Sequence, residues 1–222
     1  MNKERHILVI FPHPDDETFA TGGTIAMHAE KGTPVTYVCL TLGEMGRNLG
    51  NPPVATRESL PEIRKRELQQ AAKEIGIHDL RMMGFRDKTV EFEEDEKMTA
   101  LVLSFIEELN PSLVITFYPG YCVHPDHEAT ARAVVRAMKR IEESKRPKLH
   151  CVAFANNHEE AIGKPDILIN IAPYAEQKKA AMYAHLSQTA WMLPDMEQKW
   201  SEGDEVALNW LHLEKFWTYH LT

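Results

Sequence analysis

The sequence is poor in cysteine and has no long hydrophobic run. Its 222 residues include three cysteines, Cys39, Cys122 and Cys151, which lie far apart without a C-x-x-C spacing. Dispersed cysteines in odd number support neither a disulfide framework nor a thiolate zinc knuckle, and they favour a reducing, cytoplasmic setting. The first apolar run, residues 7–11, ends at Pro-His-Pro-Asp-Asp, so we expect neither a signal peptide nor a membrane span.

Positive charge is also scarce. The chain has 25 Lys and Arg against 33 Asp and Glu, a formal net charge of −8, which disfavours a nucleic-acid partner. With 43% hydrophobic and 26% charged residues, its composition is that of a globular protein with one sizeable core. No internal repeat, low-complexity tract or linker interrupts it. We therefore predict a single domain over residues 1–222.

Short apolar, β-branched runs alternate with segments of helical periodicity. Strands are expected at residues 7–11, 35–40, 80–83, 113–117, 152–155 and 167–171. Helices are expected at residues 15–32, 62–75, 95–109, 126–145 and 174–186. This alternation predicts an α/β fold with a mostly parallel sheet and helices on both faces, while residues from 187 onward show no firm pattern. Ligands of such sheets bind beyond the carboxyl ends of the strands, here at loops 12–18, 43–61, 84–89 and 118–127.

Two of these loops combine histidines with carboxylates. The first reads Pro12-His13-Pro14-Asp15-Asp16-Glu17, and the fourth reads His124-Pro125-Asp126-His127. A helix N-terminus stabilises an acidic group by only about 0.3–1 kcal/mol, which accounts for one aspartate and not for a crowded cluster. The aspartates could simply be N-caps beside bystander histidines. Two such clusters at one sheet edge, however, offer the imidazole and carboxylate ligands that suit zinc or another divalent transition metal.

The two motifs resemble those of the zinc-dependent N-acetylglucosaminyl deacetylases of the PIG-L/LmbE-like family. The likeness runs from about residue 5 to residue 188 by the order of strands and motifs, and it is greatest to the bacillithiol biosynthesis deacetylases. The resemblance implies a Rossmann-like α/β domain. No G-x-G-x-x-G follows the first strand, so dinucleotide binding is not implied.

The resemblance also implies roles for particular residues. It makes His13, Asp16 and His127 the metal ligands, with Zn²⁺ as the cofactor, and Asp15 the general base that takes the proton of the metal-bound water. It places His124 beside the substrate carbonyl, where it could hydrogen-bond the oxyanion or protonate the leaving amine. The products would be acetate and a free sugar amine.

Further family positions concern the substrate. Arg64, in Arg64-Lys65-Arg66-Glu67-Leu68, and Asp87 match residues that contact sugar hydroxyls or an appended anion. A solvated helix face with an ion pair is the alternative. Residues 47–73 carry six basic and three acidic residues, an excess that suits an anionic aglycone such as malate.

One departure from the family concerns a tyrosine two residues before the first histidine of the second motif. Cys122 occupies that position here and Tyr121 precedes it, so whether Tyr121 substitutes stays open. His185 matches a late family motif near the site rim, or else ends an amphipathic helix. The four late tryptophans favour core or subunit packing, which leaves homo-oligomer formation open.

Together these features predict a cytoplasmic, metal-dependent amide hydrolase that removes acetyl from an N-acetylglucosamine conjugate, N-acetylglucosaminyl-malate in bacillithiol biosynthesis. Two alternatives belong to other classes. Two histidines and one carboxylate also suit a non-haem iron oxygenase, which oxygen-dependent turnover would reveal. A non-catalytic sugar-binding module would bind without metal and release no acetate.

Overall fold

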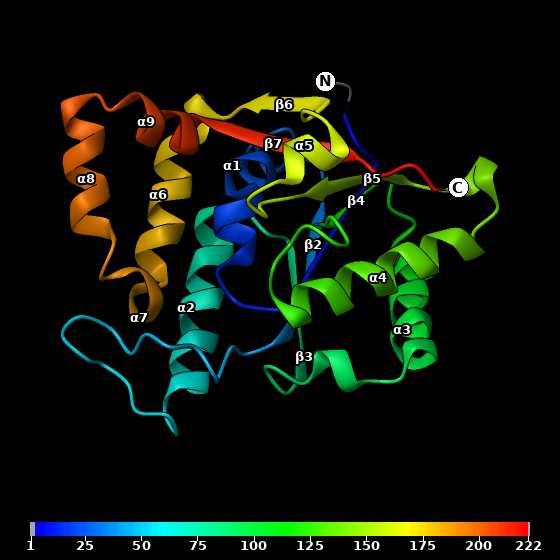
Figure 1. Ribbon diagram of the computed structural model, residues 1–222, viewed down its shortest axis with the longest axis horizontal. Helices are drawn as coiled ribbons and strands as arrows, with labels where there is room; N and C mark the ends of the chain where they lie inside the picture. Colours follow the sequence, from blue (N-terminus) through cyan, green and yellow to red (C-terminus); the bar gives the residue numbers. More distant parts are fainter. Residues whose placement is uncertain (1–2, 222) are drawn as a thin grey trace.

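A seven-stranded sheet runs through the computed structural model, which describes residues 3–221 (Figure 1). Its strand order is β3-β2-β1-β4-β5-β7-β6. The first five strands in the chain pair in parallel, and only β7 is antiparallel to its neighbours β5 and β6. The strands are β1 (Ile7–Phe11), β2 (Val35–Thr41), β3 (Asp79–Phe85), β4 (Leu113–Phe117), β5 (Lys148–Val152), β6 (Ile167–Asn170) and β7 (Leu213–Thr218).

Helices connect the strands. The α-helices are α1 (Asp16–Glu30), α2 (Leu60–Glu74), α3 (Asp95–Leu109), α4 (Pro125–Arg140), α5 (His158–Ile162), α6 (Ala175–Ala184), α7 (Leu186–Thr189), α8 (Leu193–Glu202) and α9 (Glu205–His212). The short 3-10 helices are η1 (Val90–Phe92), η2 (Glu143–Lys145) and η3 (Ala172–Tyr174). The prediction of a mostly parallel α/β sheet is confirmed.

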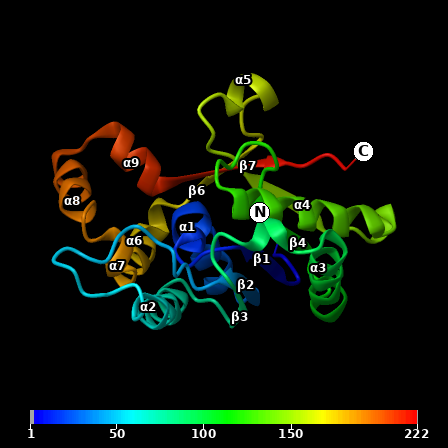
Figure 2. The same ribbon diagram turned by 60° about the horizontal axis from the view of Figure 1, so that its bottom comes forward.

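Both faces of the sheet are covered, which explains why its central strands are apolar throughout. In β1, Ile7, Val9 and Phe11 pack into one core with α1, α2 and α6, whereas Leu8 and Ile10 pack into a second core with α3 and α4. Figure 2 shows these two groups of helices on opposite sides of the strands. The alternation of side chains along a strand thus serves two cores at once.

Some predicted boundaries are wrong. The helix expected to reach residue 145 ends at Arg140, because Ile141 adopts an extended backbone. The strand expected at 152–155 lies at Lys148–Val152 instead. The segment without a firm pattern forms α7, α8, α9 and β7, which returns to the sheet between β5 and β6. None of the helices described is long and apolar enough to cross a membrane.

Candidate metal centre and active site

The loops after β1 and β4 meet because these parallel strands are neighbours. They bring three ligand-type groups together. His13 Nδ1 lies 3.1 Å from His127 Nε2, and the Asp16 carboxylate lies 3.5 Å from the first nitrogen and 3.3 Å from the second. Four ligands placed tetrahedrally at about 2.0–2.1 Å from a zinc ion are about 3.3 Å from one another. The two nitrogens therefore have about the spacing of two ligands of a zinc tetrahedron, and Asp16 places one carboxylate oxygen near each of them.

The other nitrogen of each imidazole is already hydrogen-bonded. His127 Nδ1–H donates to the Cys122 carbonyl at 3.1 Å, which leaves Nε2 with its lone pair. His13 Nε2–H donates to Asp87 at 3.1 Å and to Asp126 at 3.3 Å, which leaves Nδ1 with its lone pair. Metal-binding histidines almost always have such a partner, because it fixes the tautomer and the ring orientation. Both rings are thus prepared to bind a cation between them.

Asp126 lies beside the His13 ring, a position for which the sequence predicted no specific role beyond membership of the His/Asp cluster or an N-cap. It is fully buried, and its two oxygens accept hydrogen bonds from the backbone N–H groups of Lys88 and Val90 at 2.7 and 3.2 Å. It thereby ties the loop after β3 to the His13 ring. The signal that could have found it is the rule that a ligand histidine turns its second N–H to a carboxylate.

Asp87, predicted to contact substrate, lies in the wall of the cavity over the cluster and hydrogen-bonds to protein groups. One of its oxygens faces His13 and the other accepts from the Met45 backbone N–H at 2.9 Å, and the side chain is buried. These contacts make it a partner of the His13 ring, and its predicted contact with a sugar hydroxyl stays a prediction.

Two further groups of ligand-type atoms share His13, one with Asp87 and Asp126 and one with His124 and His127. Both are less suited to a metal than the set with Asp16. Asp126 already accepts two backbone N–H bonds, whereas the Asp16 oxygen nearest His127 accepts none from the described backbone. His124 uses Nδ1 to accept from the Asp126 N–H at 3.2 Å.

The electrostatics of the cluster favour a bound positive charge. Burial would lower the pKa of His13, but hydrogen bonds to Asp126, Asp16 and Asp87 outweigh it and raise that pKa well above its usual value. Burial would raise the pKa of Asp16, but His127 and His13 hold it far below the usual range. The carboxylates thus stay ionised and attract a proton or a metal ion.

Asp15 lies beside this cluster in a strained conformation. It precedes α1 with a φ of 88°, a left-handed value that is uncommon for any residue except glycine and that concentrates at functional sites. Its backbone N–H donates to Glu17 at 3.0 Å. Burial raises the pKa of Asp15 to about 6 although Arg64 opposes this, so the carboxylate can accept a proton near neutral pH.

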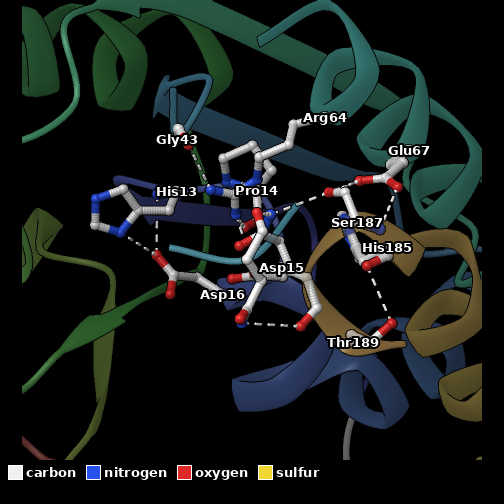
Figure 3. A network of polar contacts seen from close by, with 12 residues as sticks. His13, Pro14, Asp15, Asp16, Gly43, Arg64, Glu67, His185, Ser187 and Thr189 are labelled. Carbon is white, nitrogen blue, oxygen red and sulfur yellow. Dashed lines mark hydrogen bonds and ion pairs between the residues drawn. The ribbon is translucent and has the colours of Figure 1, made fainter. Parts of the chain in front are cut away.

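Arg64 lies in the wall of the cavity over the cluster, and its guanidinium hydrogen-bonds to protein groups there. Its guanidinium is buried and donates to the Gly43 carbonyl at 2.8 Å, to Asp15 at 2.9 Å and to the Pro14 carbonyl (Figure 3). A Cβ on Gly43, whose φ is 61°, would lie 1.8 Å from the guanidinium. The structure therefore makes Arg64 a residue that positions Asp15.

His185 does not lie at the rim of the site. It is fully buried, and its Nε2 pairs with Glu17 at 2.8 Å, behind the loop that carries Asp15. Next to it, the Ser187 N–H and hydroxyl donate to Glu67 at 2.7 and 2.6 Å, which joins α7 to α2 (Figure 3). His185 thus pairs with Glu17 behind the site, and its charge also lowers the pKa of Asp15.

His124 is placed to donate a hydrogen bond. Because its Nδ1 accepts from a backbone N–H, its Nε2 carries the proton. Burial lowers the pKa of His124, and His13 and His127 lower it further, so the ring is neutral. Tyr121, in contrast, packs edge-on against Tyr118 and is not among the described residues that line the cavity over the cluster. The structure does not bring Tyr121 to the site.

Comparison with known proteins identifies the family. Residues 8–138 match the family model PIG-L, described as GlcNAc-PI de-N-acetylase. The chain belongs to the PIG-L family. A relative from Bacillus anthracis, named probable N-acetyl-alpha-D-glucosaminyl L-malate deacetylase 2, is 52% identical over 99% of this chain and 97% of its own length. The relative of the same name from Bacillus subtilis is 48% identical over 97% of this chain and 98% of its own length.

Solved structures with low identity show the same fold. The N,N'-diacetylchitobiose deacetylase of Pyrococcus horikoshii matches with a TM-score of 0.71 and 22% identity, over 96% of this chain and 83% of that one. A 4-carboxy-2-hydroxymuconate hydratase from Pseudomonas putida matches with a TM-score of 0.72 and 21% identity, over 97% and 96%. One fold thus carries both deacetylases and a hydratase, and the site must decide the chemistry.

In this PIG-L chain, a cavity of about 330 Å³ opens over the cluster. Its walls include the three ligand-type residues together with Asp15 and His124. Two cations, Arg47 and Lys88, have exposed side chains at its edge. Neither cation forms an ion pair within residues 3–221. The cavity is lined by His13, Asp15, Asp16, Met45, Gly46, Arg47, Arg64, Asp87, Lys88, His124, His127 and Gln188.

Proposed function

We propose that this protein is a metal-dependent hydrolase that removes the N-acetyl group from N-acetylglucosaminyl-malate in bacillithiol biosynthesis. One observation carries the proposal. His13 Nδ1, His127 Nε2 and the Asp16 carboxylate lie 3.1–3.5 Å apart with their other polar atoms satisfied, next to an aspartate suited to act as a base. The names of the Bacillus relatives supply the substrate. The three free cysteines agree with a cytoplasmic location.

Zinc fits this ligand set best, because two imidazoles and one carboxylate with an open fourth position form a catalytic zinc site. His13, Asp16 and His127 would hold it. When bound, the ion supplies a Lewis acid that polarises an amide carbonyl and lowers the pKa of water to about 7.

The neighbouring residues can handle the protons of the reaction. Asp15, held by Arg64 and by the Glu17 carboxylate, takes the proton of the attacking water. The neutral His124 donates its Nε2–H to the carbonyl oxygen as negative charge develops there. The protonated Asp15 then returns its proton to the leaving amine, so that water and amide become acetate and amine.

The malate carboxylates are best met by Arg47 and Lys88. Both cations lie at the edge of the cavity without an acidic partner in the described chain, whereas both terminal nitrogens of the Arg64 guanidinium already hydrogen-bond to protein groups. The preference for an anionic aglycone is still expected, but Arg47 and Lys88 rather than Arg64 would bind the anion.

A non-haem iron oxygenase could use a similar ligand set. The pairing of Asp15, a proton acceptor, with His124, a hydrogen-bond donor, favours hydrolysis because an oxygenase needs neither group.

The test is the release of acetate by the purified, metal-loaded protein. N-acetylglucosaminyl-malate, N-acetylglucosamine and N,N'-diacetylchitobiose are compared, and both acetate and free amine are measured. We expect equal amounts of the two products, fastest release from the malate conjugate, and loss of release with chelator or in His127→Ala. No acetate from any of them, or turnover that consumes oxygen, would refute the proposal.

A further inference from the structure

A second and larger cavity lies on the other side of the ligand cluster. Its volume is about 650 Å³, and its wall includes Asp16 and His127, which also line the first cavity. Asp15 and His124 line only the first cavity. The two ligand-type side chains therefore form a boundary at which both cavities meet.

Five aromatic side chains line the second cavity. The Phe117 ring stacks on the His127 imidazole at 4.1 Å between centroids, and Phe154 approaches the same imidazole edge-on at 5.7 Å. The aromatic lining residues are Phe19, Phe117, Phe154, Trp210 and Trp217. Two of the late tryptophans thus line a cavity, beyond the packing role that the sequence suggested for them. Ligand sites of this size are typically lined by apolar and aromatic side chains.

The buried charges of the cavity are neutralised. Lys178 pairs with Glu214 at 2.8 Å, with side chains 1% and 2% exposed. Glu214 also accepts from the backbone N–H groups of Gly23 and Thr24 at 2.9 and 2.8 Å. No buried cation remains there, among the residues described, to bind a carboxylate such as malate. The other charged residues of the wall away from the ligand cluster, Glu159 and Lys215, are exposed, so the buried part of the cavity suits an uncharged, apolar group.

We propose that this second cavity binds the acyl side of the amide, and that the enzyme hydrolyses amides whose acyl group is apolar and larger than acetyl. This inference rests on the proposed function and deepens it. With the amine side in the first cavity and the carbonyl at the boundary, the acyl chain extends past Asp16 and His127. Water supplies the new C–O bond and the proton of the released amine, the C–N bond breaks, and a longer carboxylate replaces acetate.

An acyl chain series tests the inference. N-acetyl, N-hexanoyl and N-phenylacetyl forms of glucosaminyl-malate are hydrolysed by the zinc-loaded protein, and the free amine is measured. Each methylene that becomes buried raises kcat/KM by about four-fold. We therefore expect kcat/KM for the two larger acyl groups to equal or exceed the value for acetyl.

Two substitutions reduce the space for the acyl group. Val206→Trp adds bulk at a lining position that is 80% exposed, where folding is not at risk, and Ala153→Leu fills the cavity from a buried position. Each should lower the ratio of hexanoyl to acetyl kcat/KM by about ten-fold or more. Leu168→Trp is the matched control, because Leu168 is 56% exposed on β6 and is not among the lining residues described. It should leave the ratio unchanged.

The outcomes separate the two proposals. If the protein releases acetate but hydrolyses both larger amides more slowly than the acetyl form, the acyl cavity is refuted and the deacetylase stands. An unchanged ratio in Val206→Trp and Ala153→Leu also refutes it. If no amide in the series is hydrolysed, the proposed function itself fails.

Discussion

Arg64 allows a sharp test because its contacts differ from those that the sequence suggested. Replacing it with methionine keeps most of the aliphatic stem and removes the guanidinium. The change leaves the Gly43 carbonyl without its donor and the Asp15 carboxylate without its cation. Removing one partner of a buried ion pair costs about 3–5 kcal/mol. Because the Asp15 side chain is 20% exposed and can take up a proton, we expect a loss of about 2–3 kcal/mol.

In a chain of this size, 1 kcal/mol shifts Tm by about 2–4 °C, so the Tm of Arg64→Met should fall by about 4–12 °C. The assay is thermal unfolding of metal-stripped protein, with kcat/KM for N-acetylglucosaminyl-malate and for N-acetylglucosamine measured on the zinc-loaded form. Because Arg64 acts through Asp15, kcat/KM should fall by a similar factor for both substrates. Arg66→Met, an exposed neighbour on α2, is the control and should change neither quantity.

Two results would refute this reasoning. A Tm within about 1 °C of the parent value would mean that the buried contacts of Arg64 contribute little. A loss of kcat/KM confined to the malate conjugate would mean that Arg64 binds the anion after all.

Three further substitutions probe the site. Asp15→Asn should retain one equivalent of zinc by elemental analysis and lose about 10²–10⁴-fold in kcat, since the amide cannot accept a proton; near-parental turnover would show that another group is the base. Arg47→Gln and Lys88→Gln should each lower kcat/KM for the malate conjugate by about ten-fold at low salt and leave free N-acetylglucosamine unaffected, a difference that should shrink with added salt; equal losses on both substrates would contradict the anion subsite. Asp126→Asn should weaken zinc affinity by about 10–100-fold in a competition with a chelating dye, because the His13 ring loses a partner; unchanged affinity would remove Asp126 from the metal centre.

Local sequence was sufficient to predict the centre of the fold. The runs that form β1 and β4 are apolar at every position because they are covered on both faces, so their periodicity identifies them directly. The carboxy-terminal region could not be predicted in the same way. β7 is a strand only because it pairs with β5 on one side and β6 on the other, which is a tertiary contact that no local pattern encodes.

In the site, too, some features could be predicted from the sequence and others depend on tertiary contacts. Topology predicts that the loops carrying His13 and His127 meet, because the carboxyl ends of adjacent parallel strands lie at one edge of the sheet, whereas the choice of His13, Asp16 and His127 as the ligands came from the family resemblance. The roles of Arg64, Asp87 and His185 depend on which atoms face one another across loops from different strands. Spacing along the chain does not report those contacts, so the sequence could not predict the protein groups that these residues bind.

The position of the metal ion tests the account most directly. A crystal of the zinc-loaded protein, measured at the zinc absorption edge, gives that position without relying on activity. The account predicts one anomalous peak at about 2.0–2.2 Å from His13 Nδ1, His127 Nε2 and an Asp16 oxygen. A peak between His13 Nε2, Asp87 and Asp126, or no peak in fully loaded crystals, would contradict it.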